Sequence, residues 1–291
     1  MVKKVLSISF IFLLIFNLIV FSQAKDDIVV SLGEDLTEEE KQQMLNLFNT
    51  KEDIRIITVS NEEERRYLGK YINENVIGTR AISSAFVEKL DNGEGIKVET
   101  YNITWVTKEM YMNALVTAGI KDAKVKVAAP INVSGTAALT GIIKAFEKAT
   151  GLSINTKKKE VANKEIAKTG KLGQQIGKDN ASQLIKEVKE EVINRNLRDE
   201  KEIRKIIIEI SGKLDINLNE NQVNEIVDLM KDISRLNLDL KEVKNQLKGI
   251  SDKVKEIAQT NREVKSILEV ILDFLRRIFT NIMTKLNNLI Q

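Results

Sequence analysis

Apolar positions in the first half of the chain follow two spacings, either every second residue or every third to fourth. The first spacing is typical of strands and the second of helices. The polar stretch 91–95 predicts a hairpin between the third and fourth strands, and Pro130 is expected to end the fifth. The pattern predicts strands at 28–32, 54–59, 81–90, 96–104 and 123–128, and helices at 37–49, 60–71, 107–118 and 134–150.

Beyond residue 152 the strand pattern disappears and helical periodicity continues to the end of the chain. Helix starts are marked by a capping residue followed three positions later by Glu or Gln. Such pairs occur throughout the chain: Thr37/Glu40, Ser60/Glu63, Asp199/Glu202, Asn219/Gln222, Asp239/Glu242 and Thr260/Glu263. The predicted helices are 158–168, 180–194, 200–211, 220–234, 240–259 and 261–289.

The element order βαβαββαβα, followed by helices alone, predicts a mixed α+β protein. We expect an N-terminal α/β domain with a mixed sheet at residues 25–152 and an all-α helical bundle at residues 153–291.

The first 24 residues have the layout of a secretory signal peptide. Lys3 and Lys4 precede an apolar run at 5–21, and small residues stand at Ser22 and Ala24. We expect cleavage after Ala24 and a secreted, extracellular or cell-envelope location. In the alternative, the run 5–21 is retained as a membrane anchor.

The composition excludes several kinds of chemistry. The chain has no His and no Cys, which removes Ser-His-Asp and Cys-His catalysis, disulfides, and metal sites that depend on imidazole or thiolate. The net charge of +3 argues against a nucleic-acid partner. We expect no cofactor and no bound metal, and we favour a binding role over an enzymatic one.

Two short segments are candidates for anion binding. Ser134, Gly135 and Thr136 follow a predicted strand and open a helix, where backbone N–H groups can hold an anion. Arg80 follows a glycine turn and could clamp the same group. The alternatives are that Ser134 only caps the helix and that Arg80 pairs with a carboxylate. Trp105 is expected to pack in the core or at an edge, with ligand stacking as the alternative.

The last predicted helix has a wide apolar stripe at three- and four-residue steps. Exposing this stripe to water would be costly, so something must cover it. The covering surface is either the bundle's own core or an interface with an envelope protein, a membrane surface or a second copy of the chain. The interface candidates are Ile267, Ile271, Phe274, Leu275, Ile278, Ile282, Leu286 and Leu289.

Several segments carry a family resemblance, namely Val30–Thr37, Tyr67–Gly69, Ile77–Ser84, Asn102–Thr107, Ala128–Gly141, Thr169–Gly173 and Leu236–Asp239. They resemble the family of the domain of unknown function 1002, predicted secreted proteins of Gram-positive bacteria. The resemblance supports export and a Gram-positive source and carries no catalytic residues.

We therefore expect an exported, non-enzymatic cell-envelope or secreted protein that acts by binding through its α/β domain and C-terminal helices. The alternative is a hydrolase of envelope polymers that uses two acidic residues facing each other in a cleft.

Overall fold

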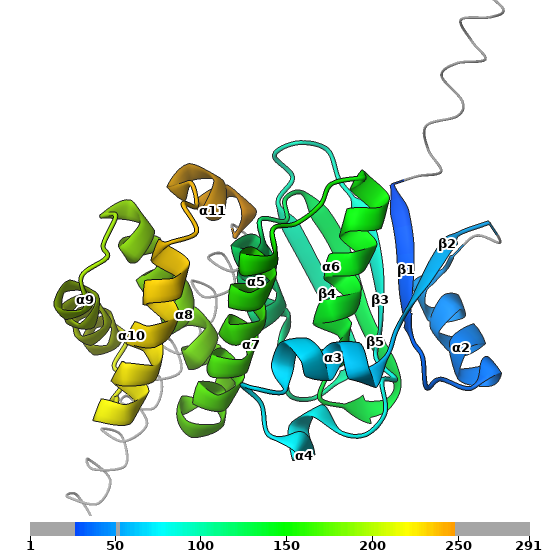
Figure 1. Cartoon of the computed structure of the whole chain (residues 1–291), viewed down its shortest axis with the longest axis horizontal. Coiled ribbons are helices and arrows are strands. Elements are labelled where there is room, and N and C mark those ends of the chain that lie inside the picture. The colour runs from blue at the N-terminus through cyan, green and yellow to red at the C-terminus, as the bar shows by residue number, and fades with distance from the viewer. Residues whose placement is uncertain (1–26, 51–52, 248–291) are drawn as a thin grey trace, which may run out of the picture. The chain divides into compact units, whose positions relative to one another are not determined.

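The computed structural model describes residues 27–50 and 53–247 (Figure 1). The strands are β1 (Ile28–Gly33), β2 (Arg55–Val59), β3 (Ser84–Lys89), β4 (Ile96–Ile103) and β5 (Ala123–Val133). The helices in the first half are α2 (Glu38–Phe48), α3 (Asn61–Leu68), α4 (Glu74–Ile77), α5 (Lys108–Ala118) and α6 (Thr136–Thr150). Those in the second half are α7 (Thr156–Ile176), α8 (Lys178–Asn194), α9 (Glu200–Lys213), α10 (Glu220–Ser234) and α11 (Leu240–Gln246).

The five strands form one mixed sheet in the order β2-β1-β3-β5-β4. β1 pairs parallel to β2 and β4 parallel to β5, whereas β3 is antiparallel to both of its neighbours, β1 and β5. The predicted mixed α+β fold is confirmed. Because β3 alone runs in the opposite direction, the carboxyl ends of β1, β2, β4 and β5 meet at the same edge of the sheet.

The predicted hairpin between β3 and β4 is wrong, because β5 lies between these two strands. The turn at 91–95 reverses the chain, but it passes over the start of β5. Asp122, directly before β5, accepts hydrogen bonds at its Oδ1 from Gly93 N at 3.0 Å and Gly95 N at 2.8 Å. Val125 and Val127 of β5 are fully buried. These two valines share one face of β5, and on the other face Lys126 Nζ donates a hydrogen bond to the backbone oxygen of Phe48 in α2 at 3.4 Å. Helices therefore cover β5 on both faces, as expected of a central strand.

The fifth strand does not end at Pro130 but continues to Val133. The pairing of β4 with β5 shifts register between Tyr101 and Ile103, which are opposite Ala128 and Val133. Pro130 lies in the extra residues of this bulge, where a missing N–H breaks no regular ladder bond.

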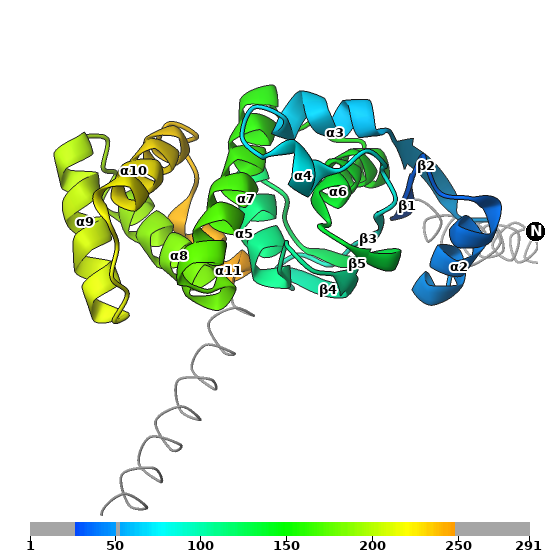
Figure 2. The ribbon, with the colours of Figure 1, turned by 90° about the horizontal axis from the view of Figure 1, so that it is seen from below.

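Helices cover both faces of the sheet (Figures 1 and 2). On one face Met44 and Phe48 of α2 pack against Val30 and Phe86. On the other face α6 lies close to β1, since a β-carbon at Gly141 would overlap the Ser31 hydroxyl. The sheet is therefore the middle of three layers, with a layer of helices on each face.

The C-terminal helices pack onto the α/β layers. α7 lies along α5, and residues up to Leu247 fall within one compact unit. α7 to α10 share an apolar core that includes Leu184, Ile207 and Met230. None of the helices in the described ranges is long and apolar enough to cross a membrane.

The turns after α8, α9 and α10 repeat one local design. Each contains a residue in the left-handed conformation, Asn196, Asp215 or Asn237, and Asn and Asp accept that conformation at low cost. Each turn ends at a side chain that caps the next helix, as predicted, namely Asp199, Asn219 and Asp239. The short helix α4 was not predicted, and α7 is longer at both ends than expected.

Candidate functional site

Arg80 is paired at the start of α2. Its Nη2 donates a hydrogen bond to the backbone oxygen of Asp35 at 2.8 Å and lies 3.6 Å from Glu40 Oε2. The ion pair that the alternative interpretation expected is therefore present.

Ser134 does not cap α6, so that interpretation is wrong. The capping position is Gly135, at φ 90°, and it has no side-chain cap. Ser134 Oγ instead lies 3.0 Å from Thr136 Oγ1, and its backbone oxygen accepts hydrogen bonds from Trp105 N and Val106 N. A β-carbon at Gly135 would overlap Ile103, so this tight turn requires glycine. Arg80 donates its hydrogen bond to Asp35, and Ser134 Oγ contacts Thr136. An anion site at Arg80, Ser134, Gly135 and Thr136 stays a prediction.

Trp105 packs where α3, α4 and α7 meet, as its core interpretation expected. It contacts a cluster that contains Leu68, Ile77 and Ala167. A β-carbon at Gly170 would overlap the indole ring, so α7 needs a glycine where it passes this tryptophan.

Other predicted residues lie outside the described part of the chain. They are the signal peptide 1–24 with its alternative anchor 5–21, the C-terminal half of the helix 240–259, and the interface candidates Ile267, Ile271, Phe274, Leu275, Ile278, Ile282, Leu286 and Leu289.

One buried carboxyl group, that of Glu64, lies close to the carboxyl edge of the sheet. Glu64 is on α3 and is 1% exposed. Its Oε2 accepts a hydrogen bond from Asn61 Nδ2 at 3.3 Å, while its Oε1 has no partner. Burial raises the pKa of Glu64 to about 7, although hydrogen bonds from Thr136 and Asn61 and the charge of Arg65 act to lower it. A carboxyl that titrates near neutrality suits proton transfer, but this one is closed off from solvent.

A second polar cluster joins α5, α7 and α8 in the interior. Lys189 and Glu165 are both 0% exposed, with Lys189 Nζ 2.8 Å from Glu165 Oε1. Nζ also donates to the backbone oxygen of Asn113 at 2.9 Å and to Thr117 Oγ1 at 3.2 Å, and Thr117 Oγ1 donates to Glu165 Oε2 at 2.5 Å. Burial lowers the pKa of Lys189, and the Glu165 carboxylate opposes that shift. All three protons of the ammonium group are bonded, so the cluster acts as an internal tie.

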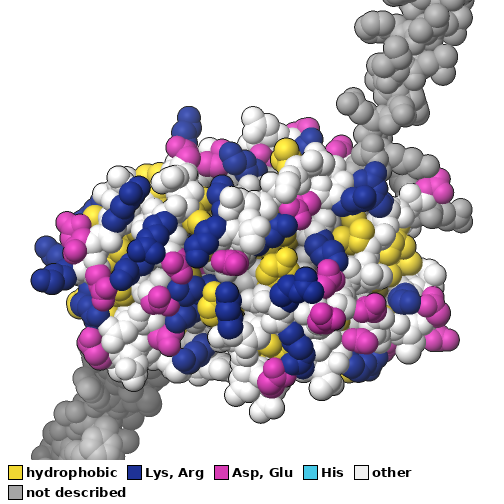
Figure 3. Space-filling model, in the orientation of Figure 1, with side chains coloured by type: hydrophobic (Ala, Val, Ile, Leu, Met, Phe, Trp, Pro, Cys, Tyr) yellow, Lys and Arg dark blue, Asp and Glu magenta, His cyan; other side chains and the backbone are white. Residues whose placement is uncertain are grey.

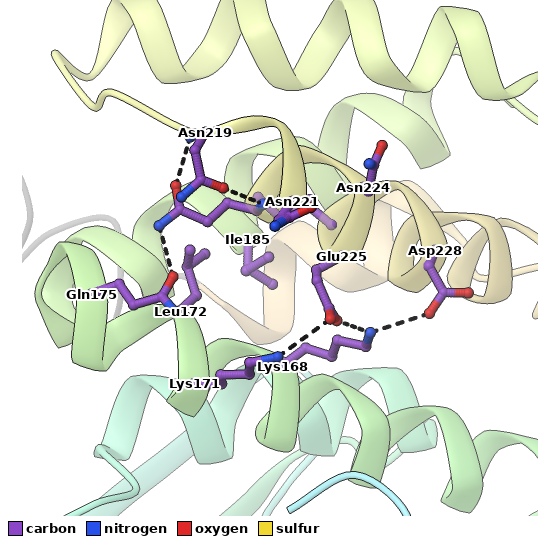
Figure 4. Close-up of a pocket in the computed structure, with 12 residues that line it drawn as sticks. Lys168, Lys171, Leu172, Gln175, Ile185, Asn219, Asn221, Asn224, Glu225 and Asp228 are labelled. Carbon is purple, nitrogen blue, oxygen red and sulfur yellow. Dashed lines mark hydrogen bonds and ion pairs between the residues drawn. The ribbon is translucent and has the colours of Figure 1, made fainter.

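A groove of about 540 Å³ opens between α7 and α10 (Figure 4). Its floor is apolar and consists of Leu172, Ile185 and Ile226. Its walls carry amide and charged side chains, namely Lys168, Lys171, Gln175, Asn219, Asn221, Gln222, Asn224, Glu225 and Asp228.

An ion-pair ladder crosses from α7 to α10 along this groove. Lys164 Nζ lies 2.6 Å from Asp232 Oδ2 and 2.7 Å from Asp228 Oδ2. Lys168 pairs with Glu225 and Asp228, and Lys171 Nζ lies 3.3 Å from Glu225 Oε1. The numbering rises on one side and falls on the other, so the two helices are antiparallel. Since the lysines recur at four- and three-residue steps, they share one face of α7.

The ladder is buried at one end and open at the other. The side chain of Lys164 is 8% exposed, that of Lys168 is 19% exposed and that of Lys171 is 60% exposed. Beyond Lys171 the contact changes from ion pair to amides, with Gln222 Nε2 donating to Gln175 Oε1 at 2.7 Å. The groove is thus lined by ion pairs toward Lys168 and by amides toward Gln175.

The sequence showed neither the groove nor the two buried clusters. Lys168 and Lys171 are two among many surface lysines by pattern alone, and which helix faces them depends on the tertiary packing. On the face seen in Figure 3, basic and acidic side chains are interspersed and hydrophobic ones occur in small groups. Within the described ranges, no three Asp or Glu residues come together as a group that could hold a metal ion.

Comparison with known proteins gives a family without an assigned activity. A family model described as a protein of unknown function (DUF1002) matches residues 32–250. The uncharacterized protein YpuA of Bacillus subtilis (strain 168) is 44% identical over 221 residues, which is 76% of each chain. No solved structure matches. With most of its length matched by the family model and by this relative, the chain belongs to the DUF1002 family.

Proposed function

We propose that this protein is exported and acts by binding an envelope polypeptide, and that the groove between α7 and α10 is its binding surface. Export rests on the leader at residues 1–24 and on the small residues Ser22 and Ala24 before the polar stretch. A role in binding rather than catalysis rests on the lack of His and Cys, which removes the commonest nucleophile and base systems.

The observation that carries the binding proposal is the chemistry of the groove. Its volume of about 540 Å³ lies within the usual range of ligand sites, roughly 300–1,000 Å³. The side-chain amide of Asn221 can both donate and accept hydrogen bonds, as a peptide backbone does. The aliphatic floor suits an apolar side chain, and no aromatic residue lines the groove as a platform for sugars. An extended polypeptide segment fits this combination best.

The apolar stripe at residues 267–289 is a second contact in this proposal. It would add an interface with the same envelope partner or with the membrane surface. Membrane flotation of the mature chain with and without residues 264–291 tests this part. Equal flotation of the two forms would remove the stripe from the proposal.

Site-specific photo-crosslinking in the native host tests the groove. A photo-reactive residue at Asn221 should form a specific adduct with a polypeptide, and the charge reversal Lys171→Glu should reduce its yield. Lys213→Glu is the matched control, because Lys213 is also an exposed helical lysine paired with one glutamate. No adduct at Asn221, or equal loss with both charge reversals, would contradict the groove as the binding surface.

Export is tested separately by the mass and location of the protein. The proposal expects a chain that begins at Lys25, found in the envelope or the medium. A full-length chain in the cytosol would overturn export and leave the crosslinking result to be judged by itself.

A further inference from the structure

We propose that residues Ser60–Gly78, which carry α3 and α4, form a strap whose packing on α6 and α7 tightens when Glu64 carries a proton and loosens when that proton leaves. The strap lies beside α6 and α7 in both ribbon views (Figures 1 and 2). It is distinct from the groove of the proposed function and does not depend on it.

The strap is held by few apolar side chains. In α3 only Glu64 and Leu68 are buried, and in α4 only Ile77. Ile72, between the two helices, completes the buried set, which packs with Ala167 of α7. A segment with so few buried contacts has a low free energy of local opening, so the state of one buried carboxyl can change its stability by a large fraction.

The surroundings of Glu64 favour the neutral carboxyl. Its hydrogen-bond donors are two neutral groups, the amide of Asn61, whose Nδ2 lies 3.3 Å from Oε2, and the hydroxyl of Thr136. A buried carboxylate needs several good donors to offset the loss of water. Consistently, burial raises the pKa of Glu64 to about 7.

The neighbouring charged side chains of the strap, Arg65 and Glu63, are bonded to groups other than Glu64. Arg65 pairs with Glu74 of α4, and it donates to the backbone oxygen of Gly78 at 2.6 Å and to Asn61 Oδ1 at 2.7 Å. The neighbouring carboxylate of Glu63 is bound by Lys144 of α6 at 2.7 Å. Because Arg65 and Lys144 bind these other groups, neither forms an ion pair with Glu64.

The neighbouring helices provide no counter-ion either. Tyr111 of α5 faces Glu64 as a neutral phenol, and its hydroxyl donates to the backbone oxygen of Gly135. Thr136 of α6 offers only a hydroxyl. On α7, Lys164 and Lys168 pair with carboxylates of α10. In the described part of the chain, no cation therefore forms an ion pair with Glu64.

Opening the strap would expose the carboxyl edge of the sheet. Ser60, Asn61, Glu62 and Glu63 form one wall of a shallow polar pocket of about 580 Å³ at the ends of β1 and β2. Ligands of open α/β sheets commonly bind outside these strand ends. Proton loss at Glu64 would therefore change access to this pocket.

Hydrogen exchange measured by mass spectrometry on the full mature chain tests the strap. A carboxyl that titrates at about 7 in the closed strap and at 4.5 in the open one shifts the opening equilibrium roughly thirtyfold between pH 5.5 and pH 8. After correction for intrinsic rates, peptides from residues 60–78 should open about thirtyfold more in the wild type at pH 8, and peptides from β3 and β5 should not change. Glu64→Gln should abolish the difference.

Glu63→Gln is the matched control, since its carboxylate is the neighbouring one and is paired with Lys144. That variant should keep the pH effect. The same pH change in wild type and Glu64→Gln, or equal changes in the strap and the sheet, would overturn the proposal. If Glu64→Gln does not fold, the wild type alone tests the proposal. The ratio of strap exchange to sheet exchange should then rise with pH, and a constant ratio would overturn the proposal.

Discussion

Glu165 and Glu64 are both buried, yet the groups around their carboxyl oxygens differ. Glu165 receives an ammonium group at 2.8 Å and a hydroxyl at 2.5 Å. Glu64 accepts hydrogen bonds from two neutral groups, the amide of Asn61 at 3.3 Å and the hydroxyl of Thr136. The first carboxyl takes part in an ion pair that ties α5, α7 and α8 together, whereas burial favours the neutral form of the second. Burial alone does not decide the state of a carboxyl, because the donors around it determine which form is stable.

Breaking the buried ion pair should have the largest effect. Lys189→Met leaves Glu165 with an uncompensated charge in the interior, and should lower the free energy of unfolding by about 3–5 kcal/mol. Urea denaturation at pH 7 measures this.

The double variant Glu165→Leu with Lys189→Met separates the charge from the packing. It should recover much of the loss, because no buried charge remains. A double variant as unstable as the single one would mean that the pair contributes mainly through shape.

Glu64→Gln should stabilise the protein at pH 8, by about 1–3 kcal/mol. The folded state holds the Glu64 proton up to about pH 7 and the unfolded chain releases it near 4.5. Stability from this group is thus complete below pH 4.5, falls as the pH rises toward 7, and stays low above it. Unfolding curves of both proteins at pH 5 and pH 8 check the sign, and a destabilised variant at pH 8 would show that the carboxylate is the favoured form.

Asn61→Ala sharpens the same contrast with a smaller effect. It removes the amide that donates to Glu64 and costs about 1 kcal/mol at pH 8. The cost should be smaller at pH 5, because a neutral carboxyl needs the donor less. An equal cost at both pH values would assign the effect to the other bonds of Asn61, those to Arg65 and Gly78.

Ser134→Ala should have the smallest effect, within about 0.5 kcal/mol. Its hydroxyl contacts only Thr136 and does not cap α6. Thr37→Ala is the control, since Thr37 forms a full capping box on α2 and should cost about 1 kcal/mol. Equal losses in thermal unfolding would mean that Ser134 supports the start of α6 after all.

Local features of the fold could be predicted from the sequence because they depend on neighbours along the chain. Thr37, Ser60 and Asn219 cap helices as the spacing of their partners indicated. A capping box is complete within four residues, so no tertiary contact is needed to find it. The strand positions and the mixed α+β class followed from periodicity for the same reason.

The tertiary structure alone decided which strands pair and which charged residues are buried. The turn predicted at 91–95 does reverse the chain, but β5 lies between β3 and β4, where its residues Val125 and Val127 are fully buried. The spacing from Ser60 marks Glu63 as a capping residue, but nothing in the local sequence distinguishes Glu62 from Glu64, of which only Glu64 is buried. The state of an ionisable group depends on partners brought together from distant positions, such as residues 117, 165 and 189. A local sequence pattern cannot predict contacts between residues so far apart along the chain.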